Sequence, residues 1–287
     1  MSAKPAAGEE EADLKKEILD KLHRFELEIL DEIDRICHEN HLRYYITAGT
    51  LLGAVRHGGF IPWDDDLDIV MPRTDYERFL KICNDVISPK YYCQSRYNCD
   101  YLTNNFAKVR AKNTVFVEGY LDSLQDQTDM GIFVDIFPLD NAKRENGIQT
   151  AQKFLVEKFT VLYFLKCGLR RDLPKAAKIP AALFTRKGLW RIRHGIATLN
   201  KDDSAGYYIN LGSKYNIRKQ TIAKKHFGEP VRLKFEDREY DAPCDYLYIL
   251  EHIYGKNYME LPPVEKRVTH DPVRLSFDLS GPDEELN

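Results

Sequence analysis

The segment Ile61–Val70 most strongly limits how this chain can fold, because four aspartates interrupt an otherwise apolar run, Ile-Pro-Trp-Asp-Asp-Asp-Leu-Asp-Ile-Val. In an extended segment, successive side chains point to opposite faces. One face would therefore carry Asp64, Asp66 and Asp68. Asp65 would lie on the other face, beside Leu67 and Ile69. We expect a strand with one acidic face and one apolar face that packs on a core.

Carboxylates this close raise one another's pKa unless a cation lies between them. Hard divalent cations such as Mg²⁺ bind carboxylate oxygens and keep coordination positions for substrate phosphates. We therefore interpret Asp64, Asp66 and Asp68 as metal ligands for phosphoryl chemistry. The alternative is a solvated acidic turn. The apolar residues that follow Asp66 argue against this alternative, which we prefer only for Asp65.

Length and composition describe an ordinary globular protein. The chain has 287 residues, enough for a sizeable core, and its net charge of −3 argues against generic nucleic-acid binding. Its six cysteines form no Cys-x-x-Cys pair, and the N-terminus does not read as a secretory leader, so we expect reduced thiols in a cytoplasmic protein. No apolar stretch is as long as the about 18 residues that a membrane-spanning helix needs.

Periodicity predicts the elements around the acidic segment. Residues 1–11 have few apolar groups and should form a flexible tail. Apolar residues then recur at three- and four-residue spacing from Leu14 to Ile36, which predicts a long helix that begins near Asp13. Residues 42–48 read as a strand, and the turn Gly49-Thr50 leads into a short helix that ends at Gly58-Gly59. The backbone N–H groups at the start of that helix can hold an anion.

Strands and helices alternate over the rest of the chain. A capping box, Thr74-Asp75-Tyr76-Glu77, predicts a helix that continues to about Val86. Further strands are expected over residues 91–95, 106–111, 114–118 and 131–138. Helices are expected over 149–200 and 246–254, and a hairpin over 231–240 around Glu236-Asp237.

Asp135 is the one carboxylate inside the apolar run Ile-Phe-Val-Asp-Ile-Phe. Burial of a lone aspartate is costly without a partner or a metal, which favours a functional role over a plain surface aspartate. Two carboxylates on one strand and a third on a neighbouring strand could hold one or two metal ions that bridge the phosphates of a nucleotide. We therefore group Asp135 with Asp66 and Asp68.

Four further residues are candidates for substrate binding. Arg56 could contact phosphate oxygens or simply lie on a helix surface. Lys108 and Arg110 lie two positions apart in a predicted strand, so they share a face that could bind phosphates or be solvated. Trp63 could stack on a base or contact a cation through its ring, or it could be a packing residue.

The segment 166–193 is strongly basic. Its cationic residues are Lys166, Arg170, Arg171, Lys175, Lys178, Arg186, Lys187, Arg191 and Arg193. Apolar residues are interleaved with them, which would suit a surface that contacts anionic lipid or a phosphorylated acceptor. A solvated helical face is the alternative.

The segment Tyr44–Phe79, with Gly-Thr-Leu-Leu-Gly-Ala-Val-Arg-His and Ile-Pro-Trp-Asp-Asp-Asp-Leu-Asp, resembles the LicD family. This family is related to the fukutin-related enzymes and belongs to the nucleotidyltransferase-fold superfamily. The segments Val134–Asp140 and Tyr254–Arg267 also resemble LicD proteins. The resemblance therefore extends over nearly the whole chain.

The resemblance implies an α/β (α+β) fold, a nucleotidyltransferase-like mixed sheet flanked by helices, with a helical, basic appendage. The catalytic core would span residues 12–145, and residues 146–287 would pack on it at the acceptor side. The superfamily pattern maps catalytic, metal-binding carboxylates onto Asp66, Asp68 and Asp135. Asp64 matches an additional aspartate of the family motif.

The implied activity is transfer of phosphocholine from CDP-choline to a sugar of teichoic acid or lipopolysaccharide, with release of CMP. Mg²⁺, or Mn²⁺ in its place, would bind the donor's diphosphate, and Gly49 and Thr50 would orient it. Asp135 would activate the acceptor hydroxyl. A lipid-linked glycan acceptor would bring this cytoplasmic enzyme into peripheral contact with the inner face of the cell membrane.

Three alternatives remain open at this point. The same residues could transfer ribitol phosphate or glycerol phosphate from the corresponding CDP carrier. They could also transfer an NMP group from an NTP. A non-catalytic nucleotide-binding module is the third, and the retained carboxylates Asp66, Asp68 and Asp135 argue against it.

Overall fold

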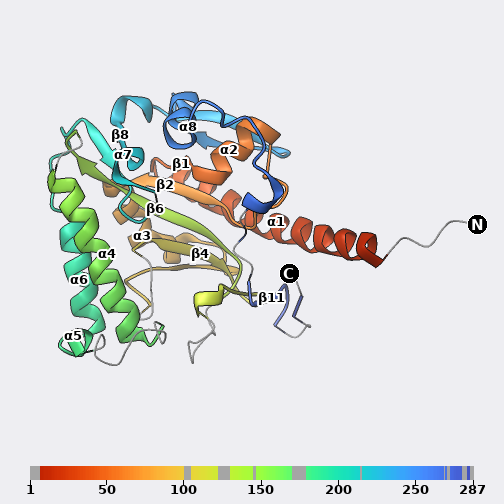
Figure 1. The fold of residues 1–287 in the computed structure, drawn as a ribbon, viewed down its shortest axis with the longest axis horizontal. Coiled ribbons are helices and arrows are strands. Elements are labelled where there is room, and N and C mark those ends of the chain that lie inside the picture. Colours follow the sequence, from red (N-terminus) through yellow and green to blue (C-terminus); the bar gives the residue numbers. More distant parts are fainter. Residues whose placement is uncertain are drawn as a thin grey trace, which may run out of the picture.

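A long N-terminal helix, α1 (Ala7–Glu39), runs along the molecule in the computed structural model (Figure 1). The structure describes residues 7–99, 105–121, 130–144, 147–169, 179–213, 215–267, 269, 272–279, 283 and 284. The helix begins at Ala7 rather than near Asp13. Residues 1–6 of the predicted tail lie outside the described residues.

The central sheet is mixed, as predicted, and helices flank it. Its main path is β1 (Tyr45–Ile46), β2 (Asp68–Pro72), β6 (Phe133–Ala142), β4 (Ala107–Ala111) and β3 (Tyr91–Gln94). Strands β2 and β6 are parallel, and the other neighbours on this path are antiparallel. The long β6 also pairs with β7 (Tyr207–Ile209), which pairs with β8 (Thr221–Ala223).

The remaining elements surround this sheet. The helices are α2 (Ala48–His57), α3 (Arg73–Val86), α4 (Gly147–Cys167), α5 (Ile179–Ala182), α6 (Arg186–Ala197), α7 (Ile217–Gln220) and α8 (Tyr246–Tyr254). Short 3₁₀ turns span Gly119–Leu121, Lys224–His226 and Val264–Lys266. Two small ribbons pair β9 (Val231–Phe235) with β10 (Arg238–Ala242) and β5 (Val115–Val117) with β11 (Arg274–Ser276). These bounds confirm the predicted hairpin, the helix that ends before Gly255, and the strands and helices of the middle of the chain.

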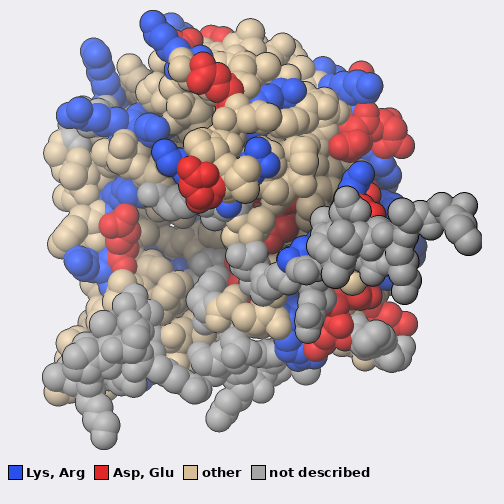
Figure 2. Space-filling model, turned by 45° about the vertical axis from the view of Figure 1, so that its right-hand side comes forward, with Lys and Arg blue, Asp and Glu red and all other residues tan. Residues whose placement is uncertain are grey.

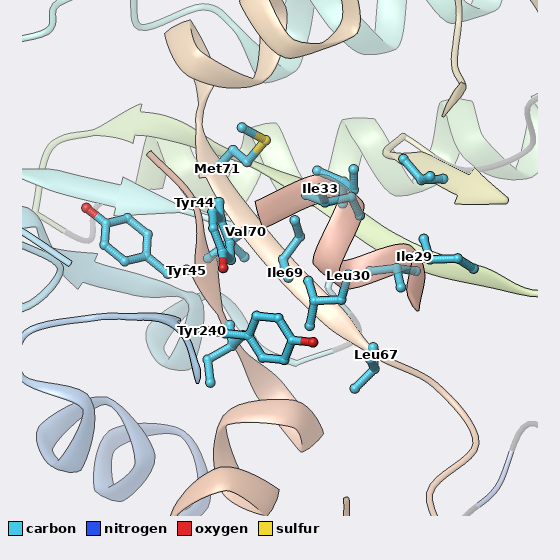
Figure 3. Packing of buried hydrophobic residues seen from close by; sticks show 14 of the residues in the cluster. Ile29, Leu30, Ile33, Tyr44, Tyr45, Leu67, Ile69, Val70, Met71 and Tyr240 are labelled. Atoms are coloured by element: carbon cyan, nitrogen blue, oxygen red, sulfur yellow. The ribbon is translucent and has the colours of Figure 1, made fainter. Parts of the chain in front are cut away.

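The main core lies between α1 and the sheet (Figure 3). Ile29 and Ile33 of α1 are fully buried, and they lie beside Leu67 and Ile69 of the acidic segment's apolar side. Burial of each such side chain stabilises the fold by roughly 1.5–3 kcal/mol. This packing fixes the apolar side of residues 67–69 against α1 and leaves the opposite side free for the cleft described below.

The C-terminal half shares the sheet and the core of the N-terminal half. Tyr208 of β7 and Tyr240 of β10 belong to the main core cluster, and β7 extends the sheet from the end of β6. A smaller apolar cluster connects α4 and α6, which run side by side, to the same edge. The predicted division at residue 145 stays a prediction.

Two strand predictions near the acidic segment are wrong in extent. The strand predicted over residues 42–48 is only the two residues of β1, because the chain already turns at Ala48 (φ 47°) into α2. The acidic segment is a strand only from Asp68 onward. Before it, Asp64 N–H donates to the carbonyl of Ile61 in a turn, and residues 64–67 form a loop.

The predicted capping box is also wrong. Helix α3 begins at Arg73, directly after Pro72, and no side chain caps it. Strand β2 continues to Pro72, so Thr74 already lies inside the first turn. The side chain of Glu77 instead pairs with Arg73 and Arg96.

The basic segment 166–193 does not form one continuous basic surface in the residues that the structure describes. Arg193 is fully buried and donates to the side chain of Asn105. Lys187 and Arg191 are exposed. Arg170, Arg171, Lys175 and Lys178 lie outside the described residues. Among the described helices, none has both the length and the apolar composition needed to cross a bilayer.

Candidate active site

A wide cleft of about 1240 Å³ opens above the ends of β2 and β6. Its walls come from the start of α2, the loop 61–68, the loop 210–215 and the segment 253–269. The face drawn in Figure 2 is hollowed between its upper and lower parts, and acidic side chains are visible there. The acidic residues that line the cleft are Asp64, Asp66, Asp68, Glu118, Asp135 and Glu260. The cleft is therefore strongly anionic.

The parallel pairing of β2 with β6 brings two predicted site residues together. Asp68 is the register partner of Asp135, and the backbone N–H of Asp135 donates to the carbonyl of Leu67 at 2.9 Å. Side chains at paired positions of adjacent strands point to the same face. The next pair, Ile69 and Ile136, is buried in the core on the other face. Alternation along each strand thus sends the carboxylates to the cleft and the aliphatic groups to the core.

The loop before β2 supplies a second set of carboxylates. Asp64, Asp65 and Asp66 each place an oxygen atom within 4.8 Å of the others. Asp65 is 2% exposed and does not line the cleft, in agreement with its predicted position on the opposite side. Within the described residues, Asp66, Asp68 and Asp135 do not form such a group.

Asp135 is paired with a buried lysine. Lys108 Nζ lies 2.8 Å from Asp135 Oδ1 and 3.3 Å from Glu118 Oε2. Burial raises the pKa of Asp135 to about 6, against the opposing effect of Lys108. Lys108 is 2% exposed and its ammonium lies over the ring of Phe133. In this geometry Lys108 is the counter-ion of Asp135 beneath the cleft.

Arg110 shares the face of Lys108 on β4, as predicted, but the structure does not bring it into the cleft. Its guanidinium donates to Gln94 Oε1 at 2.8 Å and to the carbonyl of Gly131 at 2.6 Å. The side chain is 1% exposed and does not belong to the cleft lining. Arg110 therefore ties β4 to β3 and to the start of β6.

The start of α2 holds Asp68 in place. Thr50 Oγ1 accepts a hydrogen bond from the backbone N–H of Asp68 at 2.8 Å, and Thr47 N–H donates to the carbonyl of Asp68. Thr50 is buried, so its hydroxyl positions the strand and does not face the cleft. Gly49 does line the cleft, at the N-terminal turn where backbone N–H groups have no intrahelical acceptor. Ala48, with its left-handed backbone, is a strained residue at the same place.

The Asp64 side chain lies so close to Gly49 that a larger residue at position 49 would displace it. A substitution of Gly49 therefore tests the role of Asp64. A Cβ atom at this position would lie 2.4 Å from Asp64 Oδ2. We expect Gly49→Ala to fold, because the Asp64 side chain can rotate away, and to weaken divalent-cation affinity about 10–100-fold, as loss of an orienting contact does. Titration with Mn²⁺ measures the effect. The control is Gly195→Ala, where a Cβ meets nothing within 4 Å; equal affinities in the two variants would contradict the placement of Asp64 at a cation site.

Arg56 and Trp63 both line the cleft, and both contact the segment that covers it. Arg56 Nη1 donates to the carbonyls of Tyr258 and Glu260 at 3.2 and 3.3 Å. The guanidinium of Arg267 lies over the Trp63 ring, 4.1 Å from its centroid. These contacts fasten the segment 253–269 to α2 and the acidic loop, so one wall of the cleft depends on them.

Sequence reasoning missed Glu26 and the aromatic lining. Glu26 is 1% exposed, and burial together with Asp66, Asp65 and Asp64 raises its pKa well above the usual range. A signal was present, because Glu26 lies at helical spacing between Leu22 and Ile29 on the buried stripe of α1. Besides the predicted Trp63, the aromatic residues of the lining are Phe106, Phe137, Phe164, Tyr215, Tyr254 and Tyr258. They come from five separate segments that only the fold brings together.

The donor set suits a hard divalent cation. Carboxylate oxygens are the ligands that Mg²⁺ prefers, and the oxygens of Asp64, Asp65 and Asp66 already lie close together. Asp34, His38 and Asp241 form another close group, but there Arg232 already pairs with both aspartates. The cleft is therefore the better cation site among the described residues.

Comparison with known proteins agrees with this geometry. Residues 41–166 match the family described as LicD/FKTN/FKRP, nucleotidyltransferase domain. The chain is 27% identical to the lipopolysaccharide cholinephosphotransferase LicD of Haemophilus influenzae over 85% of its own length and 92% of that protein. It is also 44% identical to an uncharacterised protein of Rickettsia typhi, but only over 19% of this chain and 18% of that protein.

The matched region begins just before β1 and ends in α4, so it contains every candidate site residue of α2, β2, β4 and β6. The resemblance to the LicD family is thereby confirmed. The prediction that the chain is an enzyme of the transferase class is also confirmed by these relationships.

Proposed function

We propose that this chain, whose residues 41–166 form a LicD-type nucleotidyltransferase domain, transfers phosphocholine from CDP-choline to a sugar hydroxyl of a cell-surface glycan precursor. The observation that carries the proposal is the parallel pairing of β2 and β6, which places Asp68 beside Asp135. Both residues line the same cleft as Asp64 and Asp66. The Haemophilus influenzae relative, named for cholinephosphate transfer and lipopolysaccharide, supports the transferred group and the class of acceptor.

Asp64, Asp66, Asp68 and Asp135 would hold Mg²⁺, with Mn²⁺ as a substitute. The bound cation would neutralise the donor's diphosphate. Gly49 lines the same cleft in the first turn of α2, where backbone N–H groups suit a phosphate oxygen. Thr50 acts indirectly, because its hydroxyl fixes the backbone of Asp68.

The reaction breaks the phosphoanhydride bond of the donor's diphosphate and forms a phosphodiester with the acceptor. The acceptor hydroxyl oxygen attacks the phosphorus that bears choline, the bond from that phosphorus to the bridging oxygen breaks, and CMP leaves with that oxygen. Asp135 accepts the hydroxyl proton, a role suited to a buried carboxylate with a pKa raised to about 6. Lys108 pairs with both Asp135 and Glu118, and these ion pairs fix the orientation of the Asp135 side chain.

The aromatic lining favours choline over ribitol or glycerol as the transferred alcohol. Phe106 and Phe137 have ring centroids 4.1 Å apart, and Tyr215 and Tyr254 form an edge-to-face pair at 6.1 Å. All four residues line the cleft. Aromatic faces attract a quaternary ammonium, whereas polyols would need hydrogen-bond partners instead. Transfer of a polyol phosphate is therefore the second candidate.

The acceptor in this proposal is a teichoic acid or lipopolysaccharide precursor. If the acceptor is lipid-linked, the enzyme works in the cytoplasm at the inner face of the membrane, as a peripheral protein. Exposed Lys187 and Arg191 of α6 are the described residues that could contact anionic head groups.

The direct test is incubation with Mg²⁺ and CDP-choline, CDP-ribitol, CDP-glycerol or CTP in parallel, with candidate glycans as acceptors. We expect CMP release and phosphocholine on the glycan, followed by ³¹P NMR, with CDP-choline turned over fastest. Faster turnover of CDP-ribitol or CDP-glycerol would establish the second candidate. Release of pyrophosphate from CTP, without CMP from any CDP donor, would identify a nucleotidyltransferase and refute the proposal.

A further inference from the structure

The helices α4, α5 and α6 form one side of the molecule (Figure 1), and α4 and α5 expose large apolar side chains there. Single exposed apolar residues are ordinary on protein surfaces, whereas a contiguous group marks an interaction site. None of these side chains lines the cleft. They form the apolar face of α4 and α5, with exposed fractions of 69% for Ile148, 54% for Phe154, 41% for Leu155, 65% for Ile179 and 81% for Leu183.

The members of the apolar face lie close together. Ile148 and Leu155 are two turns apart on α4 and therefore share one side of the helix. Phe154 directly precedes Leu155 and widens this strip. The two helices are held side by side by the rings of Phe159 in α4 and Phe184 just after α5, which meet edge to face with centroids 6.3 Å apart. The exposed residues of α5 thus extend the strip of α4 into one surface.

The charge around the apolar face is positive. Lys158 Nζ lies 5.0 Å from the centroid of the Phe154 ring, and Lys187 and Arg191 are exposed on the neighbouring α6. Within the described helices α4, α5 and α6, the one acidic residue is Glu157, which already pairs with a lysine of α4 at 3.5 Å. The face is therefore apolar and basic.

This combination fits an anionic lipid bilayer. Apolar side chains of an interfacial helix enter the boundary between head groups and acyl chains, and basic side chains meet the lipid phosphates. A second copy of the chain would instead bring the same basic residues together, and like charges across an interface are unfavourable. Because none of the described helices can cross a bilayer, the contact would be with the surface only.

Helix α4 also forms part of the cleft wall. Phe164 lines the cleft, and Lys153 Nζ donates to the carbonyl of Ser213 at 2.8 Å, in the loop 210–215 of the same wall. Lys153 and Phe164 are three turns apart and share one side of α4, and Phe154 begins the neighbouring, exposed side. A surface that contacts the apolar face would therefore lie next to the cleft.

We propose that the apolar face of α4 and α5 docks on an anionic lipid bilayer, with Lys158, Lys187 and Arg191 at the lipid phosphates, and that the acceptor is carried by a lipid of that bilayer. The statement about the acceptor rests on the proposed function, whereas the docking surface does not. Docking would hold the cleft beside the bilayer, so that a lipid-linked glycan could enter it without leaving the membrane.

The experiment is co-sedimentation of the full chain with vesicles of phosphatidylcholine, alone or mixed with an equal part of phosphatidylglycerol. We expect binding to the mixed vesicles that weakens as NaCl is added, and weaker binding to phosphatidylcholine alone. The double variant Phe154→Gln, Leu183→Gln should bind the mixed vesicles at least about 10-fold more weakly, because two apolar side chains no longer enter the interface. Both positions are exposed, so circular dichroism and the melting temperature should not change.

The matched control is the double variant Leu14→Gln, Leu247→Gln, which makes the same kind of change at positions of α1 and α8 that are 55% and 50% exposed. It should bind the mixed vesicles as the unmodified protein does. Failure of the unmodified protein to bind these vesicles, or equal losses in the two double variants, would overturn the docking surface and leave the proposed function intact. A dimer that only Phe154→Gln, Leu183→Gln dissociates would identify a second copy as the occupant and would also overturn it.

The acceptor is tested by CMP release from CDP-choline with one glycan presented either free or on a lipid in mixed vesicles. The variant Phe154→Gln, Leu183→Gln should slow the reaction with the lipid-linked glycan and leave the reaction with the free glycan unchanged. Equal rates of this variant and the unmodified protein on the lipid-linked glycan would overturn the inference about the acceptor. Vesicle binding without CMP release from any donor would instead refute the proposed function and leave the docking surface in place.

Discussion

Replacement of Asp68 by asparagine should reduce CMP release from CDP-choline by at least about 10³-fold, because it removes a carboxylate ligand of the cation that would neutralise the donor's diphosphate. The melting temperature should stay the same or rise. Asparagine keeps the size of the side chain and the backbone hydrogen bonds of Asp68 to Thr50 and Thr47. It also removes one of several mutually repelling carboxylates from the cleft. Initial rates and thermal unfolding measure the two expectations.

A matched control is Asp85→Asn, the same change at an exposed position near the end of α3, which should leave both quantities unchanged. If Asp68→Asn retained more than about a tenth of the activity, Asp68 would not be a cation ligand. If the activity fell together with a large drop in melting temperature, Asp68 would be a structural residue of β2.

Replacement of Arg73 by leucine should lower the free energy of unfolding by about 3–5 kcal/mol, the usual result of breaking a buried ion pair from one side. Arg73 Nε and Nη2 donate to the two oxygens of Asp140 at 2.7 and 2.8 Å. Asp140 is 2% exposed, so the variant would leave its carboxylate buried and unpaired. Urea unfolding at pH 7 measures the loss. The pair joins the start of α3 to β6, the strand that carries Asp135.

The pH dependence of this variant has a definite sign. Burial already raises the pKa of Asp140, and Arg73 opposes that rise. Without Arg73 the folded protein binds a proton at Asp140 more readily than the unfolded chain does. Stability of the variant should therefore recover as the pH falls from 7 toward the pKa of Asp140 in the unfolded state. The double variant Arg73→Leu, Asp140→Leu should recover most of the loss at pH 7, and a single-variant loss below about 1 kcal/mol would contradict the structural role of the pair.

Local pattern predicted much of the fold. The apolar stripe of α1, the helix α8 that ends at Gly255, and the hairpin of β9 and β10 all follow from periodicity and turn residues. These features depend on residues close together in the chain, so the sequence alone contains the information.

Pairing between distant segments could not be predicted in the same way. The register that places Asp68 beside Asp135 joins residues far apart in the chain. The apolar run around Asp135 indicated that it belongs with Asp66 and Asp68, but local pattern contains no information on the register. Lys108 was expected at a phosphate, but the fold buries it against Asp135 and Phe133. Arg193 was expected on a basic surface, but it is buried beside Asn105 and the ring of Tyr163. For a cationic side chain, the tertiary partner decides the role.

In the acidic loop, the prediction from strand alternation failed for a different reason. Alternation predicted a strand through Asp64–Leu67, but Pro62 and the turn at Ile61 delay the sheet until Asp68. As a result, Asp64, Asp65 and Asp66 cluster instead of alternating regularly. Glu26 was missed because a single acid on an apolar stripe was not weighed as a site residue, although its spacing places it beneath this loop.

The most direct test of a cation-centred site is a crystal structure with Mn²⁺ and CDP, in which anomalous scattering locates the metal independently of the protein. We expect a strong anomalous peak in contact with Asp66, Asp68 and Asp135, with the diphosphate of CDP beside Gly49. A peak only at Asp34, His38 and Asp241, or CDP bound in the cleft without any metal at these three carboxylates, would contradict the proposed catalytic centre.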